Sequence, residues 1–240
     1  SDLVRNAELL IDHAWGYEPC TIAQIRAYKP QSSSLGCGQV LHCPYTADKA
    51  RIVVQEMIDG ISLELVEKRL VTDQLVLTVG YDIENLTRPE IRKVYKGPVT
   101  TDRYGRRVPK HAHGTWNLSR ATSSSSELLE AMAALYDKIV NPALLIRRMS
   151  LSACHVVNEK MAKEREQKET FEQLDLFTDY AKKEAKEKEE QKKRERERRM
   201  QEALLTIKKK YGKNAVLRGM NFEEGATAKE RNGQIGGHQA

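Results

Sequence analysis

The composition of this chain changes sharply near Asn158. Before this residue, apolar side chains recur with the spacing of helices and strands; after it, Lys, Arg and Glu follow one another in mixed order. A hydrophobic core needs apolar side chains gathered on one face of each element, so the core must lie within about residues 1 to 158. That length is enough for one modest α/β domain with a helical appendage.

Two stretches predict long amphipathic helices. The first runs from Thr46 to about Leu70, with Asp48 in its first turn, where a carboxylate suits the helix dipole. The second opens with a capping box from Ser124 to Glu127 and is closed by Pro142. Their predicted core residues are Ala50, Val54, Met57, Ile58, Ile61 and Leu65 in the first, and Leu128, Leu129, Met132, Leu135, Tyr136 and Ile139 in the second.

Four stretches predict strands: "CGQVLHC", "DQLVLTVGYD", "GTWNLSRATS" and "LIRRMSLSACHVV". Residues 37 to 158 therefore have the order strand, helix, strand, strand, helix, strand. This order predicts an α+β fold, a four-stranded β-α-β-β-α-β sheet of ferredoxin-like pattern with two helices on one face. Residues 83 to 113, rich in Pro, Gly and basic residues, predict a long connection or an extended β-ribbon.

The ends of the chain differ from this central part. "NAELLIDHAWGYEP" and "CTIAQIRAYKP" predict short helices. Beyond Asn158, favourable i, i+4 pairs such as Glu184 with Lys188 predict a long, solvated, charged helix. The polar, glycine-rich end of the chain predicts a flexible tail.

Charge and cysteine usage restrict the partners and the compartment. The net charge of +6 favours nucleic acid as a partner, and an anionic membrane surface comes second. No apolar run reaches the roughly 18 residues of a membrane span, and no signal peptide is visible, so we expect no membrane partner. The four cysteines lack the spacing of a disulfide framework, which predicts a reduced, cytoplasmic setting.

A metal site is the other use that these residues suggest. Cys37, His42 and Cys43 are close in sequence, as are His111 and His113. In an extended strand, however, Cys37 and Cys43 share one face and His42 takes the other, so the three converge poorly on one ion. We therefore expect no metal ligands here.

The uncovered face of the predicted sheet is rich in Arg, Ser, Thr and Asn. Such a surface can hold phosphates without reading bases. The "SSSLGCG" segment before the first strand leaves backbone amides open to a phosphate. It lacks the "GKS" or "GKT" ending of a P-loop, and a plain linker is the favoured interpretation.

Several stretches together resemble the C-terminal half of Y-family translesion DNA polymerases of the ImpB/MucB/SamB (DinB/UmuC) group. They are "AELLIDHAWGYEP", "SSSLGCGQVL", "LIRRMSLSACHV", "QLDLF" and "YGKNAVLRG…ERNGQIGGH", in the family order. The resemblance implies the end of the thumb at 1–30, a linker at 31–36 and the little finger at 37–158. A clamp-binding segment at 159–178, the charged helix at 179–210 and the flexible tail at 211–240 would follow.

The resemblance also implies contacts with duplex primer-template DNA. Arg147 and Arg148 match a paired arginine that meets template phosphates in relatives, and Ser34 and Gly36 match a linker close to the DNA backbone. With the basic ribbon and the outward strand positions, the predicted DNA-binding residues are Ser34, Gly36, Arg106, Arg107, Lys110, Ser119, Arg120, Arg147, Arg148 and Ser150.

"QLDLF" matches the family's peptide for the bacterial sliding clamp. By resemblance, Gln173 contacts the pocket rim while Leu174, Leu176 and Phe177 enter an apolar cleft. The alternative is that these side chains pack on the chain's own core.

Catalysis is not expected from these residues. Two-metal polymerase chemistry needs acidic residues on a palm, and relatives carry them in N-terminal motifs that this sequence does not contain. We expect no catalytic residue and no cofactor in this fragment, with Mg²⁺ needed only by the absent palm.

Two other functions fit the sequence. The charged helix could act in a coiled coil or on an anionic surface, although it lacks an apolar heptad seam between Lys182 and Arg199. An RNA-binding module is the second, although the open sheet lacks stacking aromatics apart from Trp116, which we expect in the core.

Overall fold

The computed structural model describes residues 2–18, 20–28, 33–102, 104–169, 180–235 and 238–239. The chain divides into two compact units, residues 1–32 and 33–240. The first unit holds helix α1 (Asp2–Ala14) and helix α2 (Ile22–Ala27), as predicted. Leu10, Ile11 and Trp15 are exposed on or just after α1.

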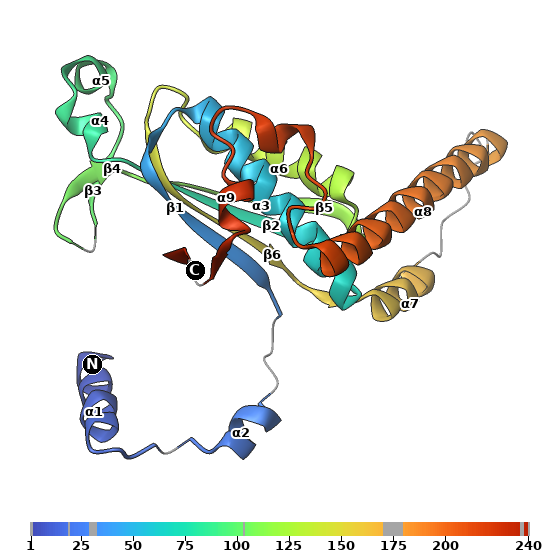
Figure 1. The fold of residues 1–240 in the computed structure, drawn as a ribbon, viewed down its shortest axis with the longest axis horizontal. Coiled ribbons are helices and arrows are strands. Elements are labelled where there is room, and N and C mark those ends of the chain that lie inside the picture. Colours follow the sequence, from blue (N-terminus) through green and yellow to red (C-terminus); the bar gives the residue numbers. More distant parts are fainter. Residues whose placement is uncertain are drawn as a thin grey trace. The chain divides into compact units, whose positions relative to one another are not determined.

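The second unit is built on an antiparallel sheet of β1 (Leu35–Tyr45), β2 (Leu70–Tyr81), β5 (Ala112–Thr122) and β6 (Ile146–Cys154) in the order β1-β6-β2-β5. A short fifth strand, β7 (Val157–Asn158), pairs with the start of β2. Helix α3 (Ala47–Lys68) connects β1 to β2, and helix α6 (Ser125–Ile139) connects β5 to β6. Both helices lie on one face of the sheet (Figure 1). The predicted β-α-β-β-α-β order is therefore present, with one strand lying between the two strands of each crossover.

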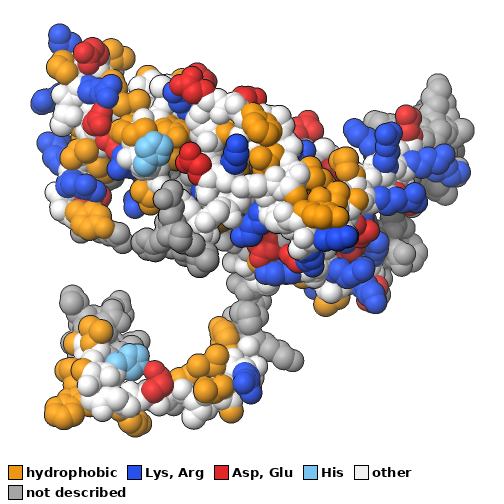
Figure 2. All heavy atoms as spheres, viewed as in Figure 1, with side chains coloured by type: hydrophobic (Ala, Val, Ile, Leu, Met, Phe, Trp, Pro, Cys, Tyr) orange, Lys and Arg blue, Asp and Glu red, His pale blue; other side chains and the backbone are white. Residues whose placement is uncertain are grey.

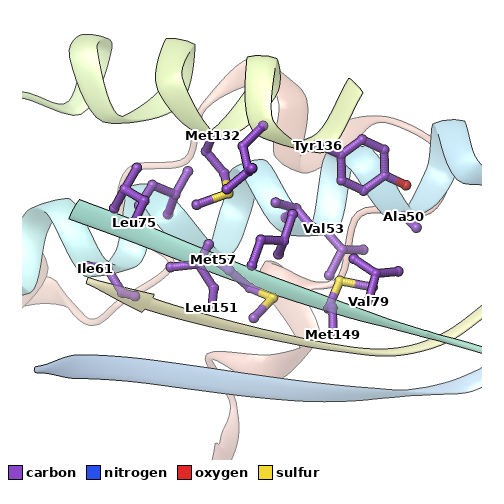
Figure 3. Close-up of a cluster of buried hydrophobic side chains, with 14 of the residues drawn as sticks. Ala50, Val53, Met57, Ile61, Leu75, Val79, Met132, Tyr136, Met149 and Leu151 are labelled. Atoms are coloured by element: carbon purple, nitrogen blue, oxygen red, sulfur yellow. The ribbon is translucent and has the colours of Figure 1, made fainter. Parts of the chain in front are cut away.

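The core lies between this sheet and the two helices (Figure 3). Alternate residues of the central strands, among them Leu75, Leu77 and Leu151, point toward the helices and are almost fully buried. Each such side chain contributes about 1.5–3 kcal/mol by leaving water. The predicted core positions of α3 are buried, as are Leu128, Met132, Leu135 and Tyr136 of α6, with Leu129 and Ile139 half-buried beside them.

The connection between β2 and β5 is a folded projection rather than a plain ribbon. It contains two short helices, α4 (Glu84–Thr87) and α5 (Pro89–Val94), and a hairpin of β3 (Val99–Thr101) and β4 (Arg107–Pro109). We call residues 83–111 the arm. Figure 1 shows it beyond one end of the sheet.

The charged helix is present as α8 (Tyr180–Tyr211), and α7 (Glu159–Glu169) precedes it. Contrary to a purely solvated helix, α8 docks on the sheet domain near the start of α6. Gln201 is 1% exposed and donates to the Ser123 carbonyl (3.0 Å) and to Ser125 Oγ (2.8 Å). Glu197 accepts the backbone N–H of Ser126 at 2.8 Å, so a carboxylate from α8 satisfies a free donor at the α6 N-terminus.

The expectation of a flexible tail at 211–240 differs from the structure. Residues 212–233 form turns, the 3₁₀ helix η1 (Gly219–Phe222) and helix α9 (Ala228–Arg231). The two-residue strands β8 (Gln234–Ile235) and β9 (His238–Gln239) pair antiparallel. Glu56 of α3, only 6% exposed, accepts Asn221 Nδ2 at 2.8 Å and the backbone N–H groups of Thr227 and Ala228 at 2.8 and 3.0 Å. We call this set of bonds the Glu56 latch. A buried carboxylate needs such donors, and composition alone does not show which donors supply them.

The Glu56 latch can be tested by mutation. Glu56→Ala removes the acceptor of the Asn221, Thr227 and Ala228 donors, so we expect the free energy of unfolding to fall by about 3 kcal/mol. Amide exchange in residues 219–231 should accelerate, as measured by hydrogen–deuterium exchange with mass spectrometry. The control Glu64→Ala breaks a partly exposed pair with Lys68 on the same helix and should cost about 0.5 kcal/mol or less. Unchanged exchange in the Glu56 variant would contradict this role.

Candidate nucleic-acid interface

The sheet face opposite α3 and α6 carries small and polar side chains. Register places Gly38, Ser150, Thr78 and His113 side by side across the four strands. We call this surface the open face; its other members are Gly36, Val40, Arg148, Ser152, Val76, Gln74, Thr115, Asn117 and Ser119. Such short side chains allow an extended ligand to approach the sheet backbone closely.

A bulge in β6 brings the paired arginines together at one end of the open face. Gly80 pairs with Arg148 and Tyr81 pairs with Ile146, which leaves Arg147 as the extra residue. Arg147 donates to the His42 carbonyl at 3.1 Å, and its Nε lies 3.8 Å from Asp82 Oδ2. Its charge is therefore partly balanced.

Arg148 lies differently. The aliphatic part of its side chain lies over Gly80. A Cβ added at Gly80 would lie 2.6 Å from Arg148 Cγ, so a larger residue there would displace the arginine. Within the described part of the chain, no carboxylate forms an ion pair with Arg148. Its exposed guanidinium is thus available to an anionic ligand, and Gly80 is a supporting residue that sequence reasoning missed.

Two other predicted residues, Gly36 and Ser150, also lie on the open face, and a third, Ser34, lies just before it. Gly36 is part of β1 and pairs with Ser152, while Ser34 is exposed just before the strand. The predicted linker at 31–36 therefore overlaps the start of β1. Ser150 sits between Gly38 and Thr78. Alternation along β2 was the signal that could have added Val76 and Thr78 to the prediction.

On β5, the structure separates the neighbours Ser119 and Arg120. Ser119 is exposed on the open face, whereas Arg120 points to the helix side and forms an ion pair with Glu127 of α6. The prediction of both as one surface does not agree with this arrangement, because successive strand residues face opposite sides.

The basic residues of the arm form a group apart from the sheet. Arg106 pairs with Asp102 and Arg107 opens β4, while Lys110 follows that strand. Arg107 and Lys110 are exposed. Apart from Arg120, the predicted residues thus form two groups, one on or next to the open face and one on the arm.

The residues considered for a metal do not gather. A register shift in β1 after Val40 breaks the alternation, so Cys37 points to the helix side while His42 and Cys43 are exposed. His113 Nδ1 lies 2.9 Å from Thr78 Oγ1. Across the described ranges, no three His, Cys, Asp or Glu side chains are placed to hold an ion.

The clamp-binding prediction rests on Gln173, Leu174, Leu176 and Phe177, which lie outside the described residues. No helix in the described part of the chain is long and apolar enough to cross a bilayer.

No family model matches the chain, and no curated protein matches it. Solved structures that are similar to it include a complex of beta-clamp processivity factor and little finger domain of PolIV, at 8% identity over 61% of this chain and 100% of that chain. The TM-score of this match is 0.32, which is too low to support an argument about fold or function.

Cysteine alkylation tests which side of β1 faces outward. Burial disfavours the charged thiolate and raises the pKa of Cys37 from 9.0 to about 11, which lowers its thiolate fraction at pH 8 about 100-fold. We expect iodoacetamide to label Cys37 at least about tenfold more slowly than the exposed Cys43, with similar rates in denaturant. Mass spectrometry of timed digests measures both rates. Equal rates in the folded protein would place Cys37, instead of Gly36 and Gly38, on the open face.

Proposed function

We propose that this chain holds duplex DNA by its backbone and recruits a sliding clamp, as the C-terminal part of an error-prone Y-family translesion polymerase in DNA damage tolerance. The open face with Arg147 and Arg148 would hold the duplex, and residues 173–177 would bind a bacterial sliding clamp. We assign no catalytic step to these residues. The resemblance places the Mg²⁺-binding carboxylates on a palm domain whose motifs this sequence does not include.

The observation that carries the DNA-binding part is the composition of the open face. Hydroxyl and amide side chains can donate to phosphate oxygens, and the exposed Arg148 adds a charge-assisted contact. The only aromatic ring among its members is the imidazole of His113. The chemistry therefore suits contact with phosphate and sugar better than readout of bases.

An RNA-binding module receives less support from the same residues. Recognition of single-stranded RNA on an open sheet depends on aromatic rings that stack on bases. Trp116 instead lies on the helix side, half-buried and packed against the core. The expectation that it belongs to the core is confirmed.

The alternative that the charged helix α8 carries the function, in a coiled coil or on an anionic surface, receives less support. Gln201 and Glu197 attach α8 to the α6 N-terminus, and Arg198 pairs with Glu159 of α7 at 3.2 Å. These contacts indicate that α8 braces the sheet domain. The face of α8 that carries Glu197, Arg198 and Gln201 contacts α6 and α7, so a coiled coil would have to use another face of the helix.

Clamp recruitment is proposed from the resemblance of "QLDLF" alone. Burial of Leu174, Leu176 and Phe177 would yield about 5–9 kcal/mol gross, and ordering the segment would take back about 2–5 kcal/mol. The contact should therefore be micromolar or weaker and should act together with the hold on DNA.

The arginine pair provides the test of DNA binding. In the double variant Arg147→Ala and Arg148→Ala, we expect duplex affinity to fall about tenfold and the slope of log K against log salt to lose about 2. Fluorescence anisotropy over a salt series measures both. The control Arg51→Ala with Lys138→Ala removes the same charge from α3 and α6 and should leave the affinity within about twofold. If both double variants lose the same duplex affinity, the loss follows from net charge alone, which would contradict the assignment of the open face as the DNA-binding surface.

The clamp contact has a separate test. Leu176→Ala with Phe177→Ala removes the two terminal apolar anchors of the motif, so we expect binding to a purified bacterial sliding clamp to be lost in surface plasmon resonance. Asp175→Ala changes the position that the motif leaves open and should retain binding. If the double variant still binds the clamp as well as the parent chain, the motif is not the contact.

A further inference from the structure

The C-terminal part of helix α8 carries a row of exposed apolar side chains. Met200, Ala203, Ile207 and Tyr211 follow one another at spacings of three, four and four residues, so they lie on one face of the helix. Met200 is 53% exposed, Ile207 is 37% exposed and Tyr211 is 67% exposed, and Ala203 is exposed beside them. Single exposed apolar residues are ordinary, whereas a row at this spacing is the pattern by which one helix packs on another. We call these four residues the α8 stripe.

The α8 stripe lies on the side of the helix that faces away from the sheet domain. Contacts with that domain come from the other side: Gln201 donates to Ser125 Oγ at 2.8 Å, and Lys209 Nζ lies 2.7 Å from Glu67 Oε1 of α3. At 3.6 residues per turn, Gln201 and Lys209 both point more than about 100° away from Ile207. The sheet domain therefore holds one side of α8 and leaves the α8 stripe exposed on the other.

The border of the α8 stripe is basic. Residues 196–211 contain six Lys or Arg against two Glu, a net charge of +4. Both carboxylates are engaged: Glu197 accepts the Ser126 backbone N–H at 2.8 Å, and Glu202 pairs with Arg198 at 3.1 Å. Figure 2 shows Lys and Arg side chains along α8. Three exposed basic residues lie beside the stripe and form no ion pair within the described ranges: Arg196, Arg199 and Lys210.

We infer that the α8 stripe binds an acidic amphipathic helix of a partner protein. The apolar side chains of that helix pack on Met200, Ile207 and Tyr211, and its carboxylates meet the basic border. Anchors spaced by three and four residues are typical of helix recognition, and the flanking charges select the partner. The contact uses neither the open face nor residues 173–177, so it adds a protein partner beyond the proposed function.

Three other occupants fit the α8 stripe less well. A second copy of this chain would bring the same basic border to the contact, and like charges at such positions oppose pairing. DNA phosphates would satisfy Arg196 and Arg199 but would gain nothing from an apolar row. A membrane surface takes up a helix whose broad apolar face sinks about 5–10 Å into it, whereas the stripe offers a single narrow row. The combination of that row with a basic border therefore favours an acidic helix.

Two synthetic peptides test the contact on the full chain. Both are helices of about 21 residues with Leu at the a and d positions of each heptad; the remaining positions hold mainly Glu in the acidic peptide and mainly Lys in the basic peptide. In fluorescence anisotropy, we expect Met200→Gln with Ile207→Gln to lower the affinity for the acidic peptide at least about tenfold, because two anchors are lost. The control Val40→Gln with Val94→Gln changes two exposed apolar residues on other elements and should stay within about twofold of the parent. Equal binding of the acidic peptide by the parent and the stripe variant, or no binding by the parent, would overturn the inference.

Charge reversal tests the choice of partner. Arg196→Glu with Arg199→Glu should weaken binding of the acidic peptide about tenfold and strengthen binding of the basic peptide by a similar factor. The same reversal at the exposed Arg92 and Lys93 of α5 should change either affinity by about twofold or less.

Two further measurements on the Met200→Gln and Ile207→Gln variant distinguish the other occupants. If vesicles containing anionic lipid bind the parent and not this variant, while the acidic peptide binds neither, the α8 stripe meets a membrane. If sedimentation shows a dimer of the parent that this variant dissociates, a second copy covers the stripe. Either outcome would overturn the inference. Duplex affinity should be the same in the parent and in this variant, so a failure of the proposed DNA surface would leave the result at the α8 stripe unchanged.

Discussion

The packing of α3 and α6 on one face of the sheet is the constraint on which the other features depend. Two helices and a four-stranded sheet bury one layer of apolar side chains, so the second sheet face needs no apolar residues. That face can be rich in Gly, Ser, Thr and Asn because the core lies on the other side of the sheet. The same packing leaves the N-terminus of α6 and the middle of α3 at positions where α8 and the tail can reach them.

Periodicity predicted most of this framework because the core side chains recur at regular spacing. The stripe of α3 from Ala50 to Leu65 and the alternation of Leu75, Leu77 and Val79 each indicate one element and its buried face. Strand order is not contained in such patterns, since pairing depends on which strand edges meet. The tail was missed for another reason: its contacts are hydrogen bonds to Glu56, a single carboxylate inside an apolar stripe.

The candidate interface was predicted unevenly for similar reasons. Ser119 and Ser150 follow from alternation, whereas Arg120 was grouped with them although the same alternation places it on the helix side beside Glu127. The bulge at Arg147 depends on pairing with β2 and could not be read from β6 alone. The segment of the arm was predicted as a long connection or an extended β-ribbon; the structure has the β3–β4 hairpin and, in addition, the short helices α4 and α5.

The Glu56 latch joins residues that are about 170 positions apart in the chain. A gene fragment that ends after β7 would encode every strand of the main sheet and still leave the Glu56 carboxylate without its partners. The boundary of the folded unit therefore lies beyond the boundary near Asn158 that hydrophobicity suggests. In related sequences, we expect a carboxylate at the position of Glu56 to be found together with a C-terminal segment like 219–231, and the two to be lost together.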